Sequence, residues 1–422
     1  MMNLLSAMRR QTFGPLAALI VFVTAATPAA PAVDVATIDH DRIMATASSA
    51  LKQEPITITA FRAKLSDGGP NDFYSNGDYW WPNPNTTNGL PYIQRDGQTN
   101  PENFTAHRQA VRQLSDAVAA LGAAYKITDD NRYAKKSSEL LKVFFLDEKT
   151  RMNPNLQYAQ AIPGVSPGRG VGIIDTLHLI EIPKAVEAME KSPVFPPETL
   201  SGLKKWFADY TEWMTTSKNG HDEANAGNNH AVAFWLQVAV FAGFTGDERN
   251  LAECRRRFTE VFVPKQMTND GSFPQELRRT KPYGYSIFQL DNMVTLCQVL
   301  SPAIGTPSTV SARPQIEKHA ETVLGAPPEA NNLWNFTLPD GRNIRKGVEF
   351  MYPFLADKSK WPSKPDVQAW DGWPARQPSL LFAGLAFGEQ KYLDLWKKLP
   401  ADPANEEVRR NIAITQPVLW LK

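Results

Sequence analysis

The sequence predicts an all-α fold, an (α/α) toroid of about six or seven helical hairpins that forms a single domain. Three observations lead to this prediction. Apolar residues recur at spacings of three and four through most of the chain, no convincing run alternates as a strand does, and one hairpin-like pattern is repeated. Hairpins that cannot bury an apolar face alone must stack on their neighbours.

The repeated pattern is the end of a helix, a turn containing Asp, Gly or Glu, and the start of a new helix. It occurs at residues 123–145, 239–262 and 384–399. Such a series could form an open solenoid or close into a ring. The 33 prolines and the long loops favour the ring, because solenoid repeats have short and regular turns.

The N-terminal residues 1–32 have the pattern of a signal peptide. Arg9 and Arg10 precede a short apolar run over residues 15–24, and Ala30-Pro31-Ala32 fits a cleavage site. The run is too short to span a bilayer, which takes roughly 20 apolar residues. We expect residues 33–422 to be exported without membrane insertion, to the periplasm of a Gram-negative source or to the medium.

The mature chain begins with an expected helix and a short extended piece at 56–60, and becomes helical throughout from residue 107. In the segment 107–125, for example, apolar residues recur every three or four positions along one face. The expected helices span residues 37–51, 107–125, 132–145, 172–191, 200–217, 229–244, 248–262, 285–300, 314–324, 344–356, 378–387 and 390–398.

Two long segments, 71–104 and 152–170, are rich in Pro, Gly and Asn and predict irregular loops. The first contains Tyr79-Trp80-Trp81, and loops of this length in compact domains are usually functional or disordered. The aromatic residues argue against disorder. The loop is therefore either a wrap packed on the outside of the ring or a lid that stacks aromatic rings on sugars.

The composition is that of a globular protein, with 42% hydrophobic and 21% charged residues and a net charge of +1. The absence of a basic excess argues against nucleic acid or an anionic membrane as the main partner. Cys254 and Cys297 both lie in helical patterns, and the sequence leaves open whether they form a disulfide. Neither has metal-ligand spacing around it, so we expect no metal and no cofactor.

Polar residues able to do chemistry lie where strongly apolar helices begin, between residues 219 and 293. They are Asn228, Asn229, His230, Arg278 and Tyr285. A rigid helix holds such side chains in place, as catalysis requires. The structural alternative is that Asn and His only cap a helix and that Tyr anchors one.

The pair Asn229-His230, with Arg278 seven residues before Tyr285, resembles the active-site pattern of the alginate-lyase-like polysaccharide lyases. Flanking segments at 79–84, 90–104, 153–164, 168–176, 222–235 and 340–354 are more similar to the glucuronan and alginate lyase branch, polysaccharide lyase family 38. The resemblance covers nearly all of the mature chain. It implies an (α/α) toroid that cleaves an acidic polysaccharide, glucuronan or alginate, by β-elimination.

In such a reaction a base removes the C5 proton of a uronate, and the sugar carboxylate must first be neutralised. Tyr285 is the preferred base and acid, since glucuronate and mannuronate place the two reacting groups on one side of the ring. His230 and Asn229 would then clamp the carboxylate, and Arg278 would assist them or lower the pKa of Tyr285. His230 remains the alternative base, as guluronate would require.

Further residues are candidates for substrate binding because they are aromatic, amide-bearing or cationic. They are Trp80, Trp81, Tyr158, Gln160, Arg169, Asn228 and Tyr283. Two other functions remain open at this point. An inverting glycoside hydrolase would need two carboxylates across a cleft, drawn from Asp222, Glu223 and Glu276. A non-catalytic polysaccharide-binding protein would need only the aromatic and cationic residues.

Overall fold

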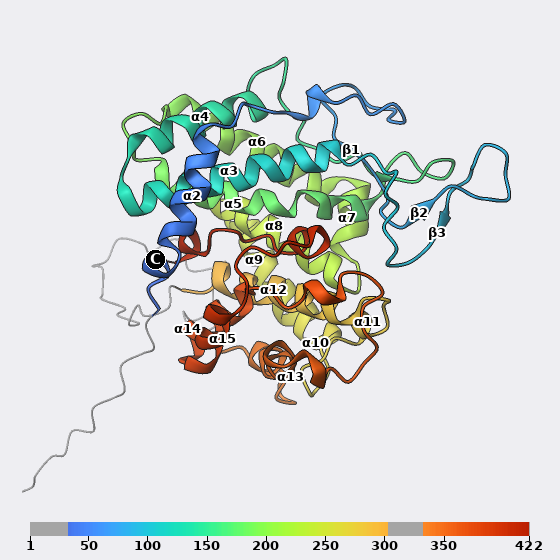
Figure 1. Ribbon diagram of the computed structural model, residues 1–422, viewed down its shortest axis with the longest axis vertical. Coiled ribbons are helices and arrows are strands. Elements are labelled where there is room, and N and C mark those ends of the chain that lie inside the picture. The colour runs from blue at the N-terminus through green and yellow to red at the C-terminus, as the bar shows by residue number, and fades with distance from the viewer. Residues whose placement is uncertain (1–32, 303–331, 422) are drawn as a thin grey trace, which may run out of the picture. The chain divides into compact units, whose positions relative to one another are not determined.

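The computed structural model describes residues 33–302 and 332–421 (Figure 1). The expected signal peptide and the expected helix at 314–324 lie outside these residues. The α-helices are α1 (Val35–Ile38), α2 (His40–Leu51), α3 (Ala106–Thr128), α4 (Asn131–Phe145), α5 (Glu181–Met189), α6 (Pro197–Thr216), α7 (Lys218–Ala224), α8 (Asn229–Thr245), α9 (Glu248–Arg257), α10 (Val263–Gln266), α11 (Pro274–Leu277), α12 (Pro282–Leu300), α13 (Ile344–Ala356), α14 (Pro378–Phe387), α15 (Gln390–Lys398) and α16 (Glu406–Arg410).

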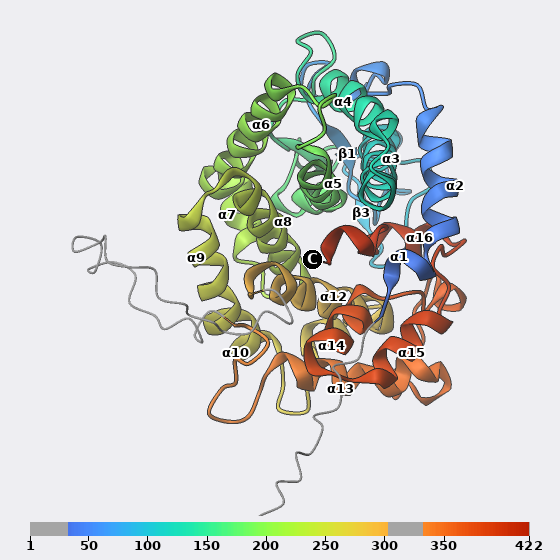
Figure 2. The same cartoon turned by 90° about the vertical axis from the view of Figure 1, so that its left-hand side faces the viewer.

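The long helices form two concentric layers around a ring (Figure 2). Helices α3, α5, α8, α12 and α14 lie inside, and α2, α4, α6, α9, α13 and α15 lie outside. The inner helices α8, α12 and α14 are buried along most of their length and have no distinct polar face, because neighbours cover them on all sides. The outer helices α4, α9 and α15 are apolar on one face only. The predicted all-α toroid is confirmed.

The three sequence repeats are helical hairpins, α3–α4, α8–α9 and α14–α15. In each, the residue after the first helix has a left-handed backbone: Asp129 at φ 54°, Gly246 at φ 78° and Gly388 at φ 69°. Two of these are Gly, which adopts positive φ without strain. The repeated turn chemistry therefore reverses the chain at the same point of each hairpin.

The two long loops contain short strands that the sequence did not predict. Strand β1 (Tyr74–Asn76) pairs in parallel with β4 (Tyr158–Ala161), which ties the loops together. Strands β2 (Trp80–Trp81) and β3 (Ile93–Gln94) pair antiparallel in a segment that projects from the ring (Figure 1). Pairs this short carry no periodic pattern that a sequence could show.

Three other segments differ in helix type or extent from the prediction. Residues Gly170–Ile180 form a 3₁₀ helix ahead of α5, and Phe258–Phe262 form a π-helical turn after α9. Gly172 lies so close to β4 that a Cβ would come within 2.4 Å of the Ala159 side chain. The piece expected to be extended at 56–60 contains a 3₁₀ turn, Ile58–Ala60.

The C-terminal segment lies in the middle of the ring (Figure 2). The buried Glu181 carboxylate of α5 accepts hydrogen bonds from the backbone N–H of Thr415 at 2.8 Å and of Gln416 at 2.9 Å. The Nζ atom of Lys126 donates to the carbonyl of Val418 at 2.9 Å. These contacts fix a segment that has little regular secondary structure of its own.

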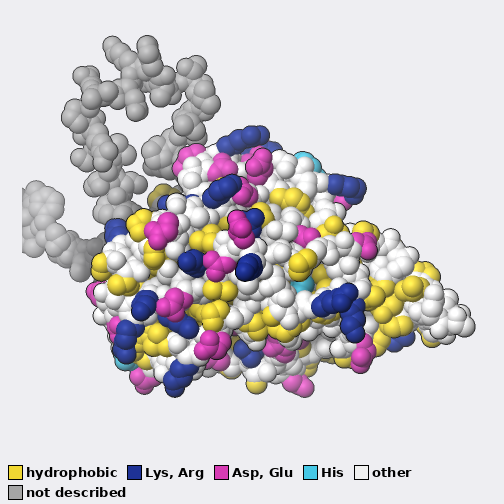
Figure 3. Space-filling view, turned by 90° about the horizontal axis from the view of Figure 1, so that it is seen from above, with side chains coloured by type: hydrophobic (Ala, Val, Ile, Leu, Met, Phe, Trp, Pro, Cys, Tyr) yellow, Lys and Arg dark blue, Asp and Glu magenta, His cyan; other side chains and the backbone are white. Residues whose placement is uncertain are grey.

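Cys254 and Cys297 are free and buried, so the disulfide left open by the sequence is not formed. Over residues 33–302 and 332–421, no helix is both long and apolar enough to cross a membrane. On the face shown in Figure 3, Lys and Arg side chains are interspersed with Asp and Glu. This mixture agrees with the net charge of +1.

Candidate active site

Tyr285 lies in the first turn of α12, where its backbone N–H donates to the Lys281 carbonyl at 3.0 Å. Its hydroxyl is 2.6 Å from the hydroxyl of Tyr79, and Arg279 donates to it at 3.3 Å. The Arg279 guanidinium also lies 4.4 Å from the centre of the Tyr285 ring. The Tyr285 oxygen therefore has two polar partners, one of which is always charged.

Burial raises the pKa of Tyr285 well above its usual value, and the neighbouring Tyr79 adds to this rise, while Arg279 opposes it. From the sequence, a positive neighbour was expected to lower the pKa of Tyr285. The neighbour is present, but its effect is smaller than the cost of ionising a phenol away from water. A phenolate formed here is a strong base, and only a small share of molecules carries it at neutral pH.

His230 is the second residue of α8, and its Nδ1 atom lies 2.6 Å from Oε1 of the buried Glu223 on α7. Burial of the imidazole works against its charge, but Glu223 outweighs burial, so the pKa of His230 is raised. Because Nδ1 is held by the carboxylate, Nε2 is the nitrogen available for a ligand. His230 can therefore act as a charged donor or, when neutral, as a base.

Asn229, next to His230, is held by Glu276 of α11. Its backbone N–H donates to one carboxylate oxygen at 2.9 Å and its side-chain NH2 to the other at 2.6 Å. The NH2 group has a second hydrogen, which remains free to donate to a substrate. Asn228 caps α8 by accepting from the His230 N–H at 3.3 Å, and the same residue lines the cavity.

These residues face one cavity of about 900 Å³ inside the ring. It is also lined by Tyr79, Trp80 and polar residues of α3 and α16. Seven residues predicted for the site line it: Trp80, Gln160, Arg169, Asn228, Asn229, His230 and Tyr285. Its size is at the upper end of pockets that hold small organic ligands.

Arg278 does not join the site, although the sequence pattern pointed to it. Its side chain is exposed, whereas Arg279 reaches the cavity, contacts Tyr285 and forms an ion pair with Asp96 at 2.8 Å. The helix α11 ends at Leu277, and of the two arginines that follow it, only Arg279 points into the cavity. Arg279, and not Arg278, is therefore the arginine that lies beside the Tyr285 hydroxyl.

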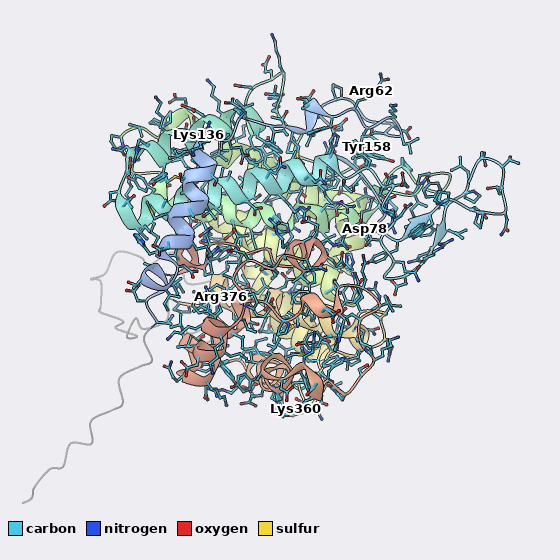
Figure 4. All side chains as sticks on the ribbon, in the orientation of Figure 1. Arg62, Asp78, Lys136, Tyr158, Lys360 and Arg376 are labelled. Atoms are coloured by element: carbon cyan, nitrogen blue, oxygen red, sulfur yellow. The ribbon has the colours of Figure 1, made fainter. Side chains whose placement is uncertain are left out.

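Three predicted substrate contacts lie away from the cavity lining. The Tyr283 side chain is fully buried and donates to the Phe354 carbonyl at 2.9 Å, so its role is structural. The Trp81 indole donates to the Gln98 carbonyl at 3.0 Å and stacks with Arg95 in the projecting segment. Tyr158, labelled in Figure 4, packs against Gly68 in the linked loops.

Arg169 and Gln160 form a polar wall beside Trp80. The Arg169 Nε atom donates to the Gln160 carbonyl at 2.8 Å, and its guanidinium lies 5.8 Å from the Trp80 ring centre. The other cavity-lining arginines of the described chain pair with carboxylates, whereas Arg169 forms no such pair with a described residue. Its charge is therefore available to an anionic ligand.

The loop 71–104 lies partly in the cavity wall and partly outside the ring, and its role as a lid stays a prediction. Tyr79 and Trp80 form part of the cavity wall, while Trp81 and the residues up to β3 project from the ring. No pattern in the sequence indicated the hydroxyl contact of Tyr79, and Glu223 and Glu276 were predicted only as carboxylates of a hydrolase. Residues 33–302 and 332–421 hold no group of three or more His, Cys, Asp or Glu side chains placed to hold a metal ion.

A family model described as alginate lyase matches residues 57–361. The structure of an alginate lyase from Bacteroides ovatus is similar at 32% sequence identity and a TM-score of 0.73, covering 89% of this chain and 93% of that one. Alginate lyase A1-III from Sphingomonas species A1 is more distant, with 13% identity and a TM-score of 0.46 over 81% of this chain and 85% of that one. No curated protein matches the sequence.

A helical toroid with this site and these similarities is a polysaccharide lyase. The chain belongs to the alginate lyase family, since the family model matches most of its length. The prediction that the protein is an enzyme is confirmed. The predicted resemblance to the alginate-lyase-like polysaccharide lyases is confirmed at the level of the family.

Proposed function

We propose that this lyase cleaves 1,4-linked polyuronates, either glucuronan or the mannuronate blocks of alginate, by β-elimination. It would leave a 4,5-unsaturated uronate at the new chain end. The observation that carries the proposal is the meeting of Tyr285, His230 and Asn229 at one cavity. The flanking sequences, similar to the glucuronan and alginate lyase branch, support the same substrate class.

The first task of the site is to neutralise the substrate carboxylate, because removal of the C5 proton adds a second negative charge. Nε2 of a protonated His230 and the free amide hydrogen of Asn229 supply two donors. Arg169, whose charge has no carboxylate partner in the described chain, supplies further positive charge along the cavity. These groups are fixed before the substrate arrives, which reduces the reorganisation needed in the transition state.

In the second step the phenolate of Tyr285 takes the C5 proton. The electron pair of the C5–H bond forms the C4–C5 double bond, and the C4–O4 bond breaks. The new phenol then gives its proton to O4, so Tyr285 returns to its starting state. Hydrogen bonds donated by Tyr79 and Arg279 would stabilise the phenolate before the first transfer and after the second.

The carboxylates required by a hydrolase have other partners. Asp222 is exposed and pairs with Lys218 at 2.6 Å, Glu223 holds His230, and Glu276 holds Asn229. Each carboxylate is thus bound to a neighbouring side chain, whereas a hydrolase needs one carboxyl to protonate the leaving group and another to activate a water. This arrangement and the lyase family both argue against an inverting hydrolase.

A substrate panel tests the proposal. Purified enzyme is incubated with glucuronan, polymannuronate and polyguluronate, and the ultraviolet absorbance of the conjugated product is followed. We expect a rapid rise with one or both of the first two polymers. A rise with polyguluronate alone would contradict the syn mechanism and favour His230 as the base, whereas reducing ends without absorbance would contradict β-elimination.

We also propose that the enzyme is exported to the periplasm after removal of residues 1–32. The charged, apolar and small-residue pattern of that segment supports this location. N-terminal sequencing of the protein from a periplasmic fraction should give Val33 as the first residue. Recovery of the uncleaved chain from the cytoplasm would contradict it.

A further inference from the structure

The short helix α16 connects the C-terminal segment to the catalytic residues. It lies in the middle of the ring (Figure 2), and Glu406, Glu407, Arg410 and Asn411 all line the catalytic cavity. Two of these side chains, Glu407 and Arg410, form a pair with Arg410 Nε at 2.8 Å from the Glu407 carboxylate. Glu407 also pairs with Lys281, whose carbonyl accepts from the Tyr285 N–H, and Arg410 also binds Asp78, the residue before Tyr79.

Glu407 reaches the catalytic helix. It forms an ion pair with Lys281, which precedes α12 and whose carbonyl accepts from the Tyr285 N–H. The Lys281 Nζ atom lies 5.1 Å from the ring centre of Tyr79 and 5.3 Å from that of Tyr285. Because Glu407 holds this ammonium, the cation is fixed near both phenol rings.

Arg410 reaches the loop. Its Nη1 atom donates to the Asp78 carboxylate at 2.7 Å, and Asp78 immediately precedes Tyr79 in the chain. Arg108 of α3 binds the other oxygen of the same carboxylate. Figure 4 labels Asp78 on the side of the ring from which β2 and β3 project. The carboxylate is therefore clamped between an inner helix and the C-terminal segment at the point where the loop enters the cavity.

We propose that Arg410 is a positioning residue that, through Asp78, holds Tyr79 against Tyr285 and so makes the C-terminal segment part of the catalytic machinery. This inference rests on the proposed role of Tyr285. Arg410 touches neither phenol oxygen with a hydrogen bond, so its effect is exerted through the loop and through its charge. Release of the clamp would let the 2.6 Å contact between the two hydroxyls lengthen.

A merely structural role is the alternative, because removal of one partner of a buried ion pair destabilises a protein. Arg409 offers a matched control, since it lies on the same short helix, is exposed, and has only a 4.0 Å contact with Glu406. We therefore compare Arg410→Gln, Arg410→Lys and Arg409→Gln, each checked by thermal unfolding. All kinetic measurements are made below the unfolding transition of the weakest variant, on whichever polyuronate the wild type cleaves.

We expect Arg410→Gln to lower kcat by about 10²-fold with little change in KM, because misplacement of a catalytic group costs that much. Arg410→Lys should recover part of the loss, and Arg409→Gln should match the wild type. Combined with Tyr79→Phe, the Arg410→Gln effect should be far smaller than it is alone, since both changes remove the same contact. The proposal would be overturned if the effects of Arg410→Gln and Tyr79→Phe on kcat were fully additive, or if Arg410→Gln left kcat unchanged.

Hydrogen-exchange mass spectrometry gives a readout that needs no substrate. The amide of Asn100 donates to the Asp78 carbonyl at 2.8 Å and the amide of Trp80 to the Gly77 carbonyl at 3.2 Å, so peptides covering these residues report on the loop. They should exchange faster in Arg410→Gln than in wild type or Arg409→Gln. Unchanged exchange in Arg410→Gln would contradict the clamp. If Arg410→Gln exchanges faster but the wild type cleaves none of the three polymers, only the proposed substrate class is contradicted.

Discussion

The hydroxyl of Tyr79 lies 2.6 Å from the hydroxyl of Tyr285, although 206 residues separate the two in the chain. One phenol must donate and the other accept, so only one of the two hydroxyl protons lies between the oxygens. When Tyr285 gives up its proton, Tyr79 can donate to the phenolate. The contact thus links a loop residue to the chemistry assigned to α12.

Replacement of Tyr285 by Phe tests that chemistry directly. It keeps the ring and removes the proton carrier, so we expect kcat to fall by about 10³-fold or more, with KM little changed. The measurement is the initial rate of ultraviolet absorbance on the best polymer of the panel.

Tyr283→Phe is the matched control for that experiment. Tyr283 lies two residues away on α12, and its buried hydroxyl donates to the Phe354 carbonyl. Its loss should cost about 1 kcal/mol of unfolding free energy and leave kcat within about twofold. If Tyr285→Phe loses no more activity than Tyr283→Phe, Tyr285 is not the proton carrier.

The fold and the centre of the site could be predicted because local patterns encode them. The turns after α3, α8 and α14 are marked by Asp or Gly residues that adopt positive φ. The pair Asn229-His230 lies where an apolar helix starts. Helical periodicity sets the faces of long helices, and the toroid follows from stacking them.

The rest of the site depends on contacts between distant segments, which no local pattern encodes. Tyr79 comes from an irregular loop, and Arg410 from a five-residue helix near the C-terminus. The choice between Arg278 and Arg279 is a difference of one position directly after the end of the four-residue helix α11. Periodicity does not predict side-chain direction at such a position.

The pair Arg278 and Arg279 gives a second test. The positive charge of Arg279 opposes the rise in the pKa of Tyr285, so Arg279→Ala should raise that pKa further. If the phenolate is the active form, the rise of kcat with pH should move to higher pH. Arg278→Ala should leave the kcat profile in place, and a larger shift for Arg278→Ala than for Arg279→Ala would contradict the assignment.

Stability should depend on pH through Asp291, a buried carboxyl of α12. Burial raises its pKa from 3.8 to about 7, and one of its oxygens has no hydrogen-bond partner among the described residues. Between these values the folded state binds more protons than the unfolded state, so the free energy of unfolding falls as pH rises from about 4 to about 7. An asparagine at this position cannot ionise, so in Asp291→Asn the free energy of unfolding should decrease less over this pH range.

Denaturant unfolding at pH values across that window checks the Asp291 prediction. The exposed Asp371 provides the control, because Asp371→Asn should follow the wild-type curve. At low pH, Asp291→Asn should resemble the wild type, and above neutrality it should be the more stable protein. Equal slopes for the wild type and Asp291→Asn would show that this carboxyl does not titrate on unfolding.

The last prediction decides which role His230 plays. Glu223 raises the pKa of His230 against the effect of burial, so Glu223→Gln should lower that pKa. A clamp on the substrate carboxylate must be protonated and is lost as pH rises through its pKa. In the variant, activity should therefore fall at lower pH than in the wild type, as measured by kcat/KM on polymannuronate. A base must be neutral, so extension of activity to lower pH in Glu223→Gln would assign the proton abstraction to His230 instead of Tyr285.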